Sequence, residues 1–322
     1  MREVRLDDQV VVLTGAGRGI GRQHALLLAR LGAKILVADS GTDLFGRGGD
    51  PAPAESVAAG ISAAGGVAVA YTGDLCTEEG ARGAIDVARA RWGRIDAVVH
   101  NAGFTLGGRS FGDDSLDRLD RLLSINTRAA FALASQAWPT MLEQNYGRMV
   151  FTSSSALHGL PRSIPYSIAK ASLVGLTRGL AAEGAAAGIK VNCVEPVGAT
   201  RMAENLVDSE FRTWFLDKMR PELVSPLVAV LASDVCPVSG ELLVAGGGRY
   251  ARTILGETPG WISDDPSPES VLEHLSTITD ASHIEVIIDG VHASAHHAQL
   301  LGFVPTSPIT VIAGSSPANR TP

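Results

Sequence analysis

Residues 9–21, with the sequence QVVVLTGAGRGIG, place a run of branched apolar residues directly before a glycine-rich turn. Such a continuous apolar run predicts a buried β-strand that is covered on both faces. Residues 19–33 then carry apolar side chains at helical spacing and end at a glycine. The stretch therefore predicts a strand, a tight turn and a helix, which together begin a parallel α/β fold.

The same alternation continues along the chain. Further apolar runs predict six more strands, at 34–40, 66–74, 94–103, 147–155, 188–196 and 240–248. Stretches with helical periodicity separate these runs, as in a continuous helix predicted over 115–138. We therefore predict an α/β fold with a doubly wound, seven-stranded parallel sheet, flanked by helices and joined by right-handed crossovers.

Two regions depart from this alternation. Residues 40–55 form a loop rich in Gly, Pro and Asp. Beyond residue 250 the strand–helix pattern stops: 267–278 predicts a helix with a serine N-cap, 284–290 predicts a short strand, and the end of the chain is rich in Pro and Ser. We interpret residues 251–322 as an extension of the first 250 residues, because they hold too few apolar residues for a core of their own.

Composition narrows the range of functions. The chain has 322 residues, of which 45% are hydrophobic and 19% charged, and its net charge is -7. It has no basic run of the kind that binds nucleic acid, no signal-peptide pattern and no apolar run long enough to span a bilayer. The three cysteines are widely spaced and the histidines follow no metal-binding pattern. We expect a cytoplasmic protein with no metal site, no disulfide and a small-molecule substrate.

The glycine-rich turn, TGAGRGIG at 14–21, predicts a dinucleotide site. Glycines let the backbone approach a pyrophosphate, and the following helix N-terminus offers free N–H donors and a positive dipole end. Asp39 ends the second predicted strand, where a carboxylate accepts hydrogen bonds from the ribose hydroxyls of NAD and repels the 2′-phosphate of NADP. Arg18 argues the other way, for NADP. We favour NAD.

The ends of the next strands add to this site. Asp74 and Leu75 can flank an adenine, or can form a simple turn; Asn101 can tie strand ends together, and Gly103 can leave room for a cofactor. Ligands of such sheets bind beyond the carboxyl ends of the strands. The complete set of predicted cofactor-binding residues is Gly15, Arg18, Gly19, Ile20, Gly21, Asp39, Asp74, Leu75, Asn101, Ala102, Gly103, Tyr166, Lys170, Pro196 and Thr200.

The predicted catalytic residues are Asn126, Ser153, Tyr166 and Lys170. Tyr166 and Lys170 lie one helical turn apart and share a face. A nearby ammonium and a positive nicotinamide both favour phenolate, which lets a tyrosine move the proton of a carbinol at working pH. A serine hydroxyl can hold the substrate oxygen, with Ser154 and Ser155 as alternatives to Ser153. The amide of Asn126 can hold a water that links Lys170 to solvent.

These motifs carry a resemblance. The glycine turn, HNAG at 100–103, Asn126, Ser153 and YSIAK at 166–170 resemble the short-chain dehydrogenase/reductase family over residues 5–250. The resemblance implies a Rossmann-type NAD-binding catalytic domain over 1–250. It also implies an Asn-Ser-Tyr-Lys tetrad, and dimers or tetramers formed through 115–138 and 164–187. Two departures stand out: His100 replaces the common Asn, and Val197 follows Pro196 where Gly is usual.

Within this family, residues 136–155, 181–202 and 220–233 resemble the (3R)-hydroxyacyl-CoA dehydrogenase and 17β-hydroxysteroid dehydrogenase branch of the peroxisomal multifunctional β-oxidation enzyme. That branch uses NAD. The resemblance implies oxidation of a secondary alcohol on a bulky apolar substrate, either a (3R)-hydroxyacyl-CoA or a 17β-hydroxysteroid. The alternatives are an NADPH-dependent 3-oxoacyl reductase and, more remotely, a non-catalytic dinucleotide sensor. Residues 200–222, which mix basic and aromatic residues, and the extension from 251 are expected to shape substrate access.

Overall fold

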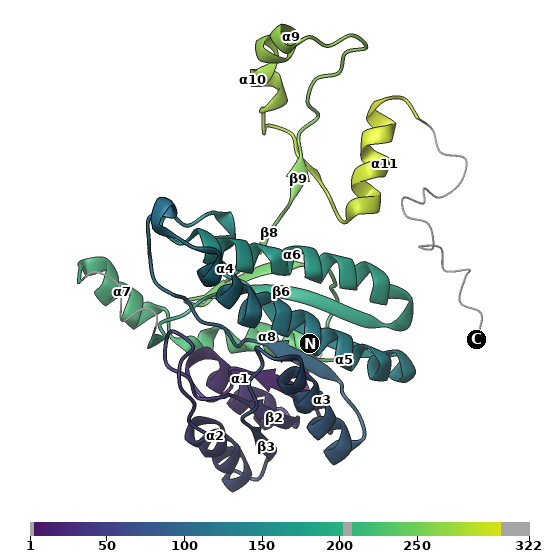
Figure 1. Ribbon diagram of the computed structural model, residues 1–322. Helices are drawn as coiled ribbons and strands as arrows, with labels where there is room; N and C mark the ends of the chain where they lie inside the picture. The colour runs from purple at the N-terminus through teal and green to yellow at the C-terminus, as the bar shows by residue number, and fades with distance from the viewer. Residues whose placement is uncertain (1–2, 202–207, 304–322) are drawn as a thin grey trace. The chain divides into compact units, whose positions relative to one another are not determined.

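The computed structural model describes residues 3–201 and 208–303. The chain divides into two compact units, Met1–Arg252 and Thr253–Pro322 (Figure 1). Among the described residues, we find no helix with the length and apolar character needed to span a membrane.

The first unit is built on one sheet whose strand order is β3-β2-β1-β4-β5-β6-β7-β8. All seven predicted strands are present and pair in parallel. They are β1 Val10–Thr14, β2 Lys34–Ala38, β3 Val67–Tyr71, β4 Ala97–His100, β5 Gly147–Thr152, β6 Ile189–Val197 and β7 Leu242–Gly246. The order reverses between β1 and β4, which is where ligands bind in doubly wound sheets.

The sheet has an eighth strand that the sequence analysis missed, β8 Arg249–Thr253, next to β7. The two strands are joined by Gly247 and Gly248, which both have positive φ, at 57° and 82°. Two such residues make the tight turn of a hairpin. The glycines were interpreted as the end of the last strand, because the alternating residues that follow them carry too few apolar side chains to indicate a strand.

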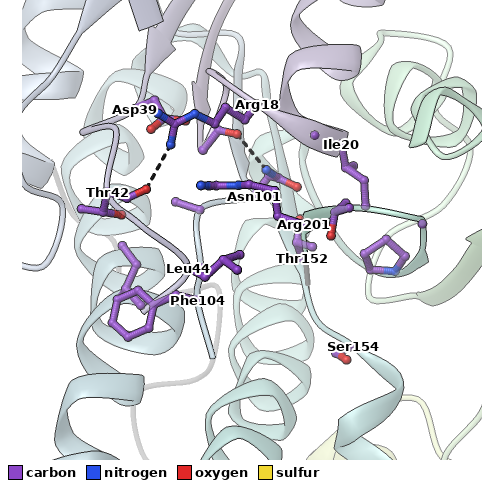
Figure 2. A pocket seen from close by; sticks show the side chains of 18 of the residues that line it. Arg18, Ile20, Asp39, Thr42, Leu44, Asn101, Phe104, Thr152, Ser154 and Arg201 are labelled. Atoms are coloured by element: carbon purple, nitrogen blue, oxygen red, sulfur yellow. Dashed lines mark hydrogen bonds between the residues drawn. The ribbon is translucent and has the colours of Figure 1, made fainter. Parts of the chain in front are cut away.

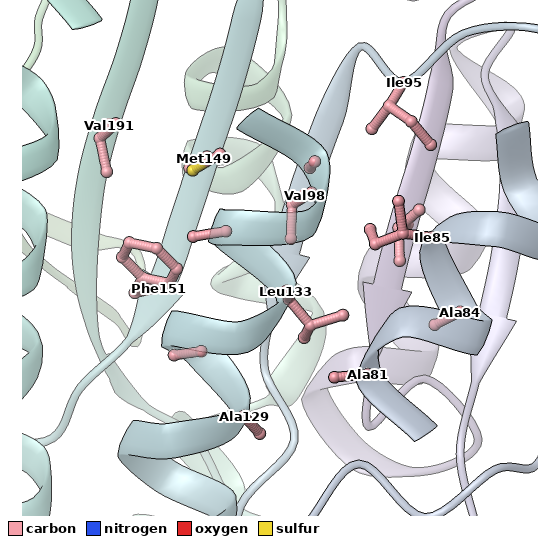
Figure 3. Close-up of a cluster of buried hydrophobic side chains, with 14 of the residues drawn as sticks. Ala81, Ala84, Ile85, Ile95, Val98, Ala129, Leu133, Met149, Phe151 and Val191 are labelled. Atoms are coloured by element: carbon pink, nitrogen blue, oxygen red, sulfur yellow. The ribbon is translucent and has the colours of Figure 1, made fainter. Parts of the chain in front are cut away.

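Helices cover both faces of the sheet, and the side chains of β1 alternate between the two resulting cores. Val10 and Val12 pack in one core with α3 Glu78–Trp92, α5 Ala129–Gln144 and α6 Ile164–Gly184. Val11 and Leu13 pack in the other with α1 Gly19–Arg30, α2 Ala52–Ala63 and α8 Ser225–Ala232. Figure 3 shows the first core, which contains Ile85 from α3, Leu133 from α5 and Phe151 from β5. Burial of each such side chain contributes about 1.5–3 kcal/mol.

The helix predicted over 115–138 is interrupted. It consists of α4 Leu116–Leu123, a π-helical turn over Ser124–Arg128, and α5. A π turn places one extra residue in the helix, and such turns are frequent at functional sites. This one contains the buried Asn126.

Shorter elements complete the first unit: α7 Glu210–Lys218 and the 3₁₀ turns η1 Phe111–Asp113, η3 Ser155–His158, η4 Ala185–Ala187 and η6 Pro221–Leu223. The predicted basic and aromatic segment 200–222 is thus partly helical, although 202–207 lie outside the described residues.

The second unit contains β9 Gly256–Glu257 paired with β10 Glu285–Val286, and the helices α9 Pro268–Glu273, α10 Leu275–Ile278 and α11 Gly290–Leu300. Ser267 caps α9 through a reciprocal capping box with Ser270, as its position before the proline predicted. The helix predicted over 267–278 is divided at His274. The Pro- and Ser-rich end of the chain lies outside the described residues from 304 onward.

Candidate active site

A cavity of about 240 Å³ lies at the carboxyl ends of the parallel strands (Figure 2). Its walls contain most of the predicted site residues: Gly15, Arg18, Gly19, Ile20, Asp39, Leu75, Asn101, Ala102, Gly103, Ser153, Tyr166, Lys170, Pro196 and Thr200. Figure 2 shows Arg18, Asp39 and Thr42 at one end and Ser154 at the other. We call the first end, with Gly17 and Gly41, the nucleotide end. The chemical end comprises Asn126, Ser153, Ser154, Tyr166 and Lys170.

The carboxylate of Asp39 is fixed at the nucleotide end by two backbone N–H groups. Gly17 N donates to Oδ2 and Gly41 N to Oδ1, each at 2.8 Å. An ionised carboxylate has about four acceptor positions, so both oxygens can still accept a bond from a hydroxyl. Arg18 is directed toward the loop after β2, where it donates to Thr42 O at 3.1 Å and lies 3.7 Å from the carboxylate of Asp50.

The N-terminus of α1 opens at the same end. Among the described residues, no side chain caps it, and its first turn contains no acidic residue. The first N–H groups of a helix lack partners within the helix, and together with the positive dipole end they attract an anion. Gly19, at φ 52°, makes the turn into the helix. This end fits the pyrophosphate and ribose of a dinucleotide.

Behind the nucleotide end, His100 links the ends of β1 and β4 to the π-helical turn. Its Nε2 lies 3.0 Å from Ile125 O, which only accepts, so Nε2 donates and Nδ1 accepts from the Thr14 hydroxyl at 2.9 Å. The Thr14 oxygen in turn accepts from the backbone N–H groups of Asn101 and Ala102. Burial lowers the pKa of His100 to about 3, with a smaller contribution from the charge of Lys170. His100 is therefore a neutral donor.

At the chemical end, Lys170 and Tyr166 project from the first turns of α6. Lys170 Nζ donates to Thr152 O at 2.7 Å and lies 5.7 Å from the centre of the Tyr166 ring. Burial lowers the pKa of Lys170 to about 8. Burial also raises the pKa of Tyr166, and a hydrogen bond with Ser154 opposes this effect. The sequence argument expected the ammonium to lower the pKa of the phenol, but in this structure desolvation is the larger effect.

Two serines lie at this end, as the sequence left open. Ser153 is buried and its hydroxyl donates to Lys170 O at 2.8 Å. Ser154 contacts Tyr166 through the hydrogen bond described above and also accepts from Ala156 N, which begins η3. Both residues contribute to the cavity wall.

Asn126 does not line the cavity but lies directly behind it. Its Nδ2 donates to Leu122 O at 2.9 Å, whereas its buried Oδ1 has no hydrogen-bond partner among the described residues. A Cβ added to Gly103 would lie 2.5 Å from this Oδ1 and 3.3 Å from Lys170 Nζ. Gly103 therefore leaves room for Asn126 and Lys170; it also lines the cavity, and its role in leaving room for a cofactor stays a prediction. A buried acceptor without a partner costs about 1–3 kcal/mol, and a bridging water would satisfy it.

Two predicted cofactor residues lie outside the cavity wall. Asp74 accepts from Cys76 N at 2.9 Å, which is the turn that we had weighed as its alternative role. A Cβ on Gly21 would lie 2.0 Å from Gly15 O, so this glycine permits the tight turn itself. The sequence analysis missed several residues of the wall: Thr42, Asp43, Leu44, Phe104 and Ile125. Three of these come from the 40–55 loop, whose Gly- and Asp-rich sequence indicated only that it was a loop.

The chain belongs to the short chain dehydrogenase family, because the family's model matches residues 9–210. It is 38% identical over 283 residues to a short-chain type dehydrogenase/reductase of Mycobacterium tuberculosis, covering 87% of this chain and 97% of the relative. It is 36% identical over 287 residues to peroxisomal multifunctional enzyme type 2 of Mus musculus. That match covers 87% of this chain but only 38% of the mouse protein.

Two solved structures have similar folds. The full-length peroxisomal multifunctional enzyme type 2 of Drosophila melanogaster superposes with a TM-score of 0.76 and 28% identity, over 92% of this chain and 50% of the fly protein. A 7α-hydroxysteroid dehydrogenase complexed with NADH and 7-oxo glycochenodeoxycholic acid has a TM-score of 0.69 and 26% identity, over 77% of this chain and 98% of that protein. The chain is therefore an oxidoreductase of this family, with a site for a nicotinamide dinucleotide.

Proposed function

We propose that this protein is an NAD-dependent dehydrogenase that oxidises a secondary alcohol on a bulky apolar substrate to the ketone. The observation that carries the proposal is the composition of the cavity. It has the fixed carboxylate of Asp39 and the open N-terminus of α1 at one end, and Tyr166 with Lys170 at the other.

In the proposed mechanism, Tyr166 takes the proton of the substrate hydroxyl. When bound, the nicotinamide accepts the hydride of the carbinol carbon, so the alcohol loses one proton and one hydride and becomes a ketone. The hydroxyl of Ser153, which donates to Lys170 O in the structure, would turn to donate to the substrate oxygen beside the phenol. The contact between Ser154 and Tyr166 favours Ser154 as a second candidate for this role.

Lys170 and Asn126 support the proton transfer. The ammonium of Lys170 stabilises negative charge on Tyr166 by electrostatic attraction. The unpartnered Oδ1 of Asn126 lies near Lys170 Nζ over Gly103, where it can hold a water that passes the proton toward solvent. This arrangement accounts for a buried amide oxygen that otherwise destabilises the fold.

The preference for NAD rests on Asp39. Its carboxylate accepts from ribose hydroxyls but repels a 2′-phosphate. The alternative, an NADPH-dependent 3-oxoacyl or carbonyl reductase, is favoured by Arg18 and Arg201 in the cavity wall. Arg18 already interacts with Thr42 O and Asp50, so we assign it to the loop after β2.

Two substrate classes are candidates. The sequence resemblance to the multifunctional enzymes implies a (3R)-hydroxyacyl-CoA, and the similarity to a 7α-hydroxysteroid dehydrogenase supports a steroid. The exposed aromatic side chains of α7, Phe211 and Trp214, suit the apolar part of either substrate.

We further propose that residues 1–250 form the catalytic domain, that 251–322 act as a lid or interface, and that the protein is a cytoplasmic homo-oligomer. Exposed apolar side chains on α4, α5 and α6 support assembly through these helices; they are Leu116, Phe131 and Ile168. The three free cysteines fit a reducing compartment.

The test is a screen for NADH formation with estradiol, testosterone and (3R)-3-hydroxyacyl-CoAs, repeated with NADP. We expect oxidation of at least one of these alcohols, with higher kcat/KM for NAD. A strong preference for NADP would contradict the cofactor assignment. The absence of turnover with either cofactor would contradict the proposed reaction.

A further inference from the structure

A buried carboxylate lies beside the chemical end, in a position that the catalytic roles above do not use. Glu195 is in β6, where the preceding residues of the same face, Val191 and Cys193, are apolar and fully buried. The Glu195 side chain is only 3% exposed. Burying a carboxylate costs several kcal/mol unless it is paired, so this residue at the end of an apolar strand face needs an explanation.

Glu195 lies next to the proposed reaction site. Ser153 N donates to Val194 O at 2.8 Å, which places the backbone of Ser153 beside Glu195. The residue after Glu195 is Pro196, which contributes to the cavity wall together with Ser153 and Ser154. The backbone of Glu195 therefore lies next to the wall of the chemical end, although its side chain is not part of that wall.

The partner of this carboxylate is His158, whose Nε2 lies 3.2 Å from Glu195 Oε2. The imidazole is 54% exposed, in contrast to the buried carboxylate. His158 ends η3, which Ser154 caps at its beginning, and Leu160 N donates to Ser167 Oγ on α6 at 3.1 Å. The backbone on both sides of His158 is thus anchored to the chemical end, at Ser154 and next to Tyr166.

The hydrogen bond to Glu195 fixes the orientation of the His158 imidazole. A carboxylate only accepts, so Nε2 of His158 donates to Glu195 and Nδ1 is left for another polar group. A carboxylate that fixes one ring nitrogen in this way sets both the orientation of the ring and the role of the other nitrogen. His158 is not part of the cavity wall, so its exposed side can bind an oxygen of a molecule that extends from the chemical end of the cavity.

We propose that His158, positioned by Glu195, recognises a second oxygen of the substrate, a hydroxyl or carbonyl close to the carbinol that is oxidised. This inference rests on the proposed function and narrows its substrate class. It favours alcohols with a 1,3 arrangement of oxygens, as in a 3-hydroxyacyl thioester, over a steroid whose second oxygen lies at the far end of the ring system. His158 would contact the substrate, and Glu195 would be a positioning residue.

The test compares three alcohols with the same eight-carbon chain and a hydroxyl at carbon 3: 3-octanol, 1,3-octanediol and ethyl 3-hydroxyoctanoate. The second has a hydroxyl and the third a carbonyl as the additional oxygen, so they also show which group the imidazole prefers. The variants are His158→Phe, Glu195→Gln and the double variant. His283→Phe, at an exposed position of the second unit, is the matched control.

We expect His158→Phe to lower kcat/KM for the preferred two-oxygen substrate about tenfold or more, the effect of one lost hydrogen bond to a charged or polarised group. The kcat/KM for 3-octanol and the affinity for NAD should stay within about threefold of those of the unmodified protein, since neither molecule uses the additional contact. Glu195→Gln should also lower kcat/KM for the preferred two-oxygen substrate, but by a smaller factor. The double variant should lose no more than His158→Phe alone, because Glu195 acts through His158.

Several results would overturn the inference while leaving the proposed function intact. The first is that His158→Phe lowers kcat/KM equally for all three alcohols, or for none of them. The second is that the effects of the two substitutions on kcat/KM are strictly additive. The third is that the unmodified protein oxidises estradiol but none of the three eight-carbon alcohols. If the unmodified protein oxidises neither these alcohols nor any of the alcohols in the screen above, the proposed function itself is wrong, and the inference is wrong with it.

Discussion

At the nucleotide end of the cavity the charged side chains of Asp39 and Arg18 have partners within the protein, whereas at the chemical end a buried amide is only partly satisfied. Both oxygens of Asp39 accept backbone hydrogen bonds. By contrast, Asn126 keeps a buried oxygen without a partner among the described residues, and burial lowers the pKa of Lys170 and raises that of Tyr166.

This difference follows from what each end is proposed to do. A binding site gains affinity when its groups are held in the bound geometry in advance. A site that moves protons needs groups whose pKa values are shifted and whose hydrogen-bonding capacity is available to the reaction. Substitutions at the chemical end should therefore reduce turnover with little change in cofactor affinity, and substitutions at the nucleotide end should change cofactor affinity and preference.

At the chemical end, substitution of the two serines is expected to lower turnover by different factors. Ser153→Ala should lower kcat about a hundredfold, comparable to the loss of one donor that holds a reacting oxygen. Ser154→Ala should lower it less than about tenfold, because Ser154 only adjusts the phenol. Steady-state kinetics with the best alcohol of the screen would measure both. The reverse order would assign the substrate oxygen to Ser154.

A smaller effect is expected at the nucleotide end. Asp39→Ala should lower kcat/KM for NAD about tenfold and raise it for NADP, because it removes both an acceptor for the ribose hydroxyls and a charge that repels phosphate. Asp74→Ala is the matched control, since Asp74 holds a turn outside the cavity wall. Asp74→Ala should alter thermal stability without altering the ratio of kcat/KM for NAD to kcat/KM for NADP. A ratio that responds to Asp74→Ala and not to Asp39→Ala would reverse the two assignments.

The smallest effect is expected behind the nucleotide end, at His100, and it concerns stability. The folded pKa of about 3 lies below the ordinary histidine pKa of 6.5, so the unfolded chain binds more protons between these values. The contribution of His100 to the free energy of unfolding is therefore complete above pH 6.5, and it falls as the pH is lowered toward 3. The loss should reach about 2 kcal/mol by about pH 5.

His24, whose pKa burial also lowers to about 3, should contribute an equal loss. In urea unfolding at several pH values, His100→Asn should therefore show about half the acid dependence of the unmodified protein. His283→Asn, which replaces an exposed histidine, should leave the dependence unchanged. If His100→Asn also leaves it unchanged, His100 is not a buried neutral histidine.

The sequence predicted the parallel sheet well because its signals are local. Branched apolar runs identified all seven parallel strands, and the glycine turn identified where β1 passes into α1. The same reasoning missed β8, whose edge position leaves its side chains largely exposed and its pattern weak. It also missed the π turn at Ser124–Arg128, because one extra residue in a helix hardly changes its periodicity.

At the site, the sequence predicted residues whose type and spacing carry the chemistry, such as Tyr166 and Lys170. It did not identify the pairing of His158 with Glu195, because these residues are 37 positions apart and meet only through the folding of η3 against β6. Nor did it predict that burial would dominate the pKa of Tyr166, because desolvation depends on the packing of the whole unit.

The most direct test of the central claim is the turnover of Tyr166→Phe together with its affinity for NAD, measured by steady-state kinetics and by fluorescence titration. The account predicts that turnover falls about a thousandfold or more, since general acid–base catalysis contributes on this scale. It predicts that NAD binds with affinity within about threefold of the unmodified protein, because the phenylalanine keeps the ring and removes only the hydroxyl. Turnover that survives this substitution would contradict the claim that Tyr166 moves the proton.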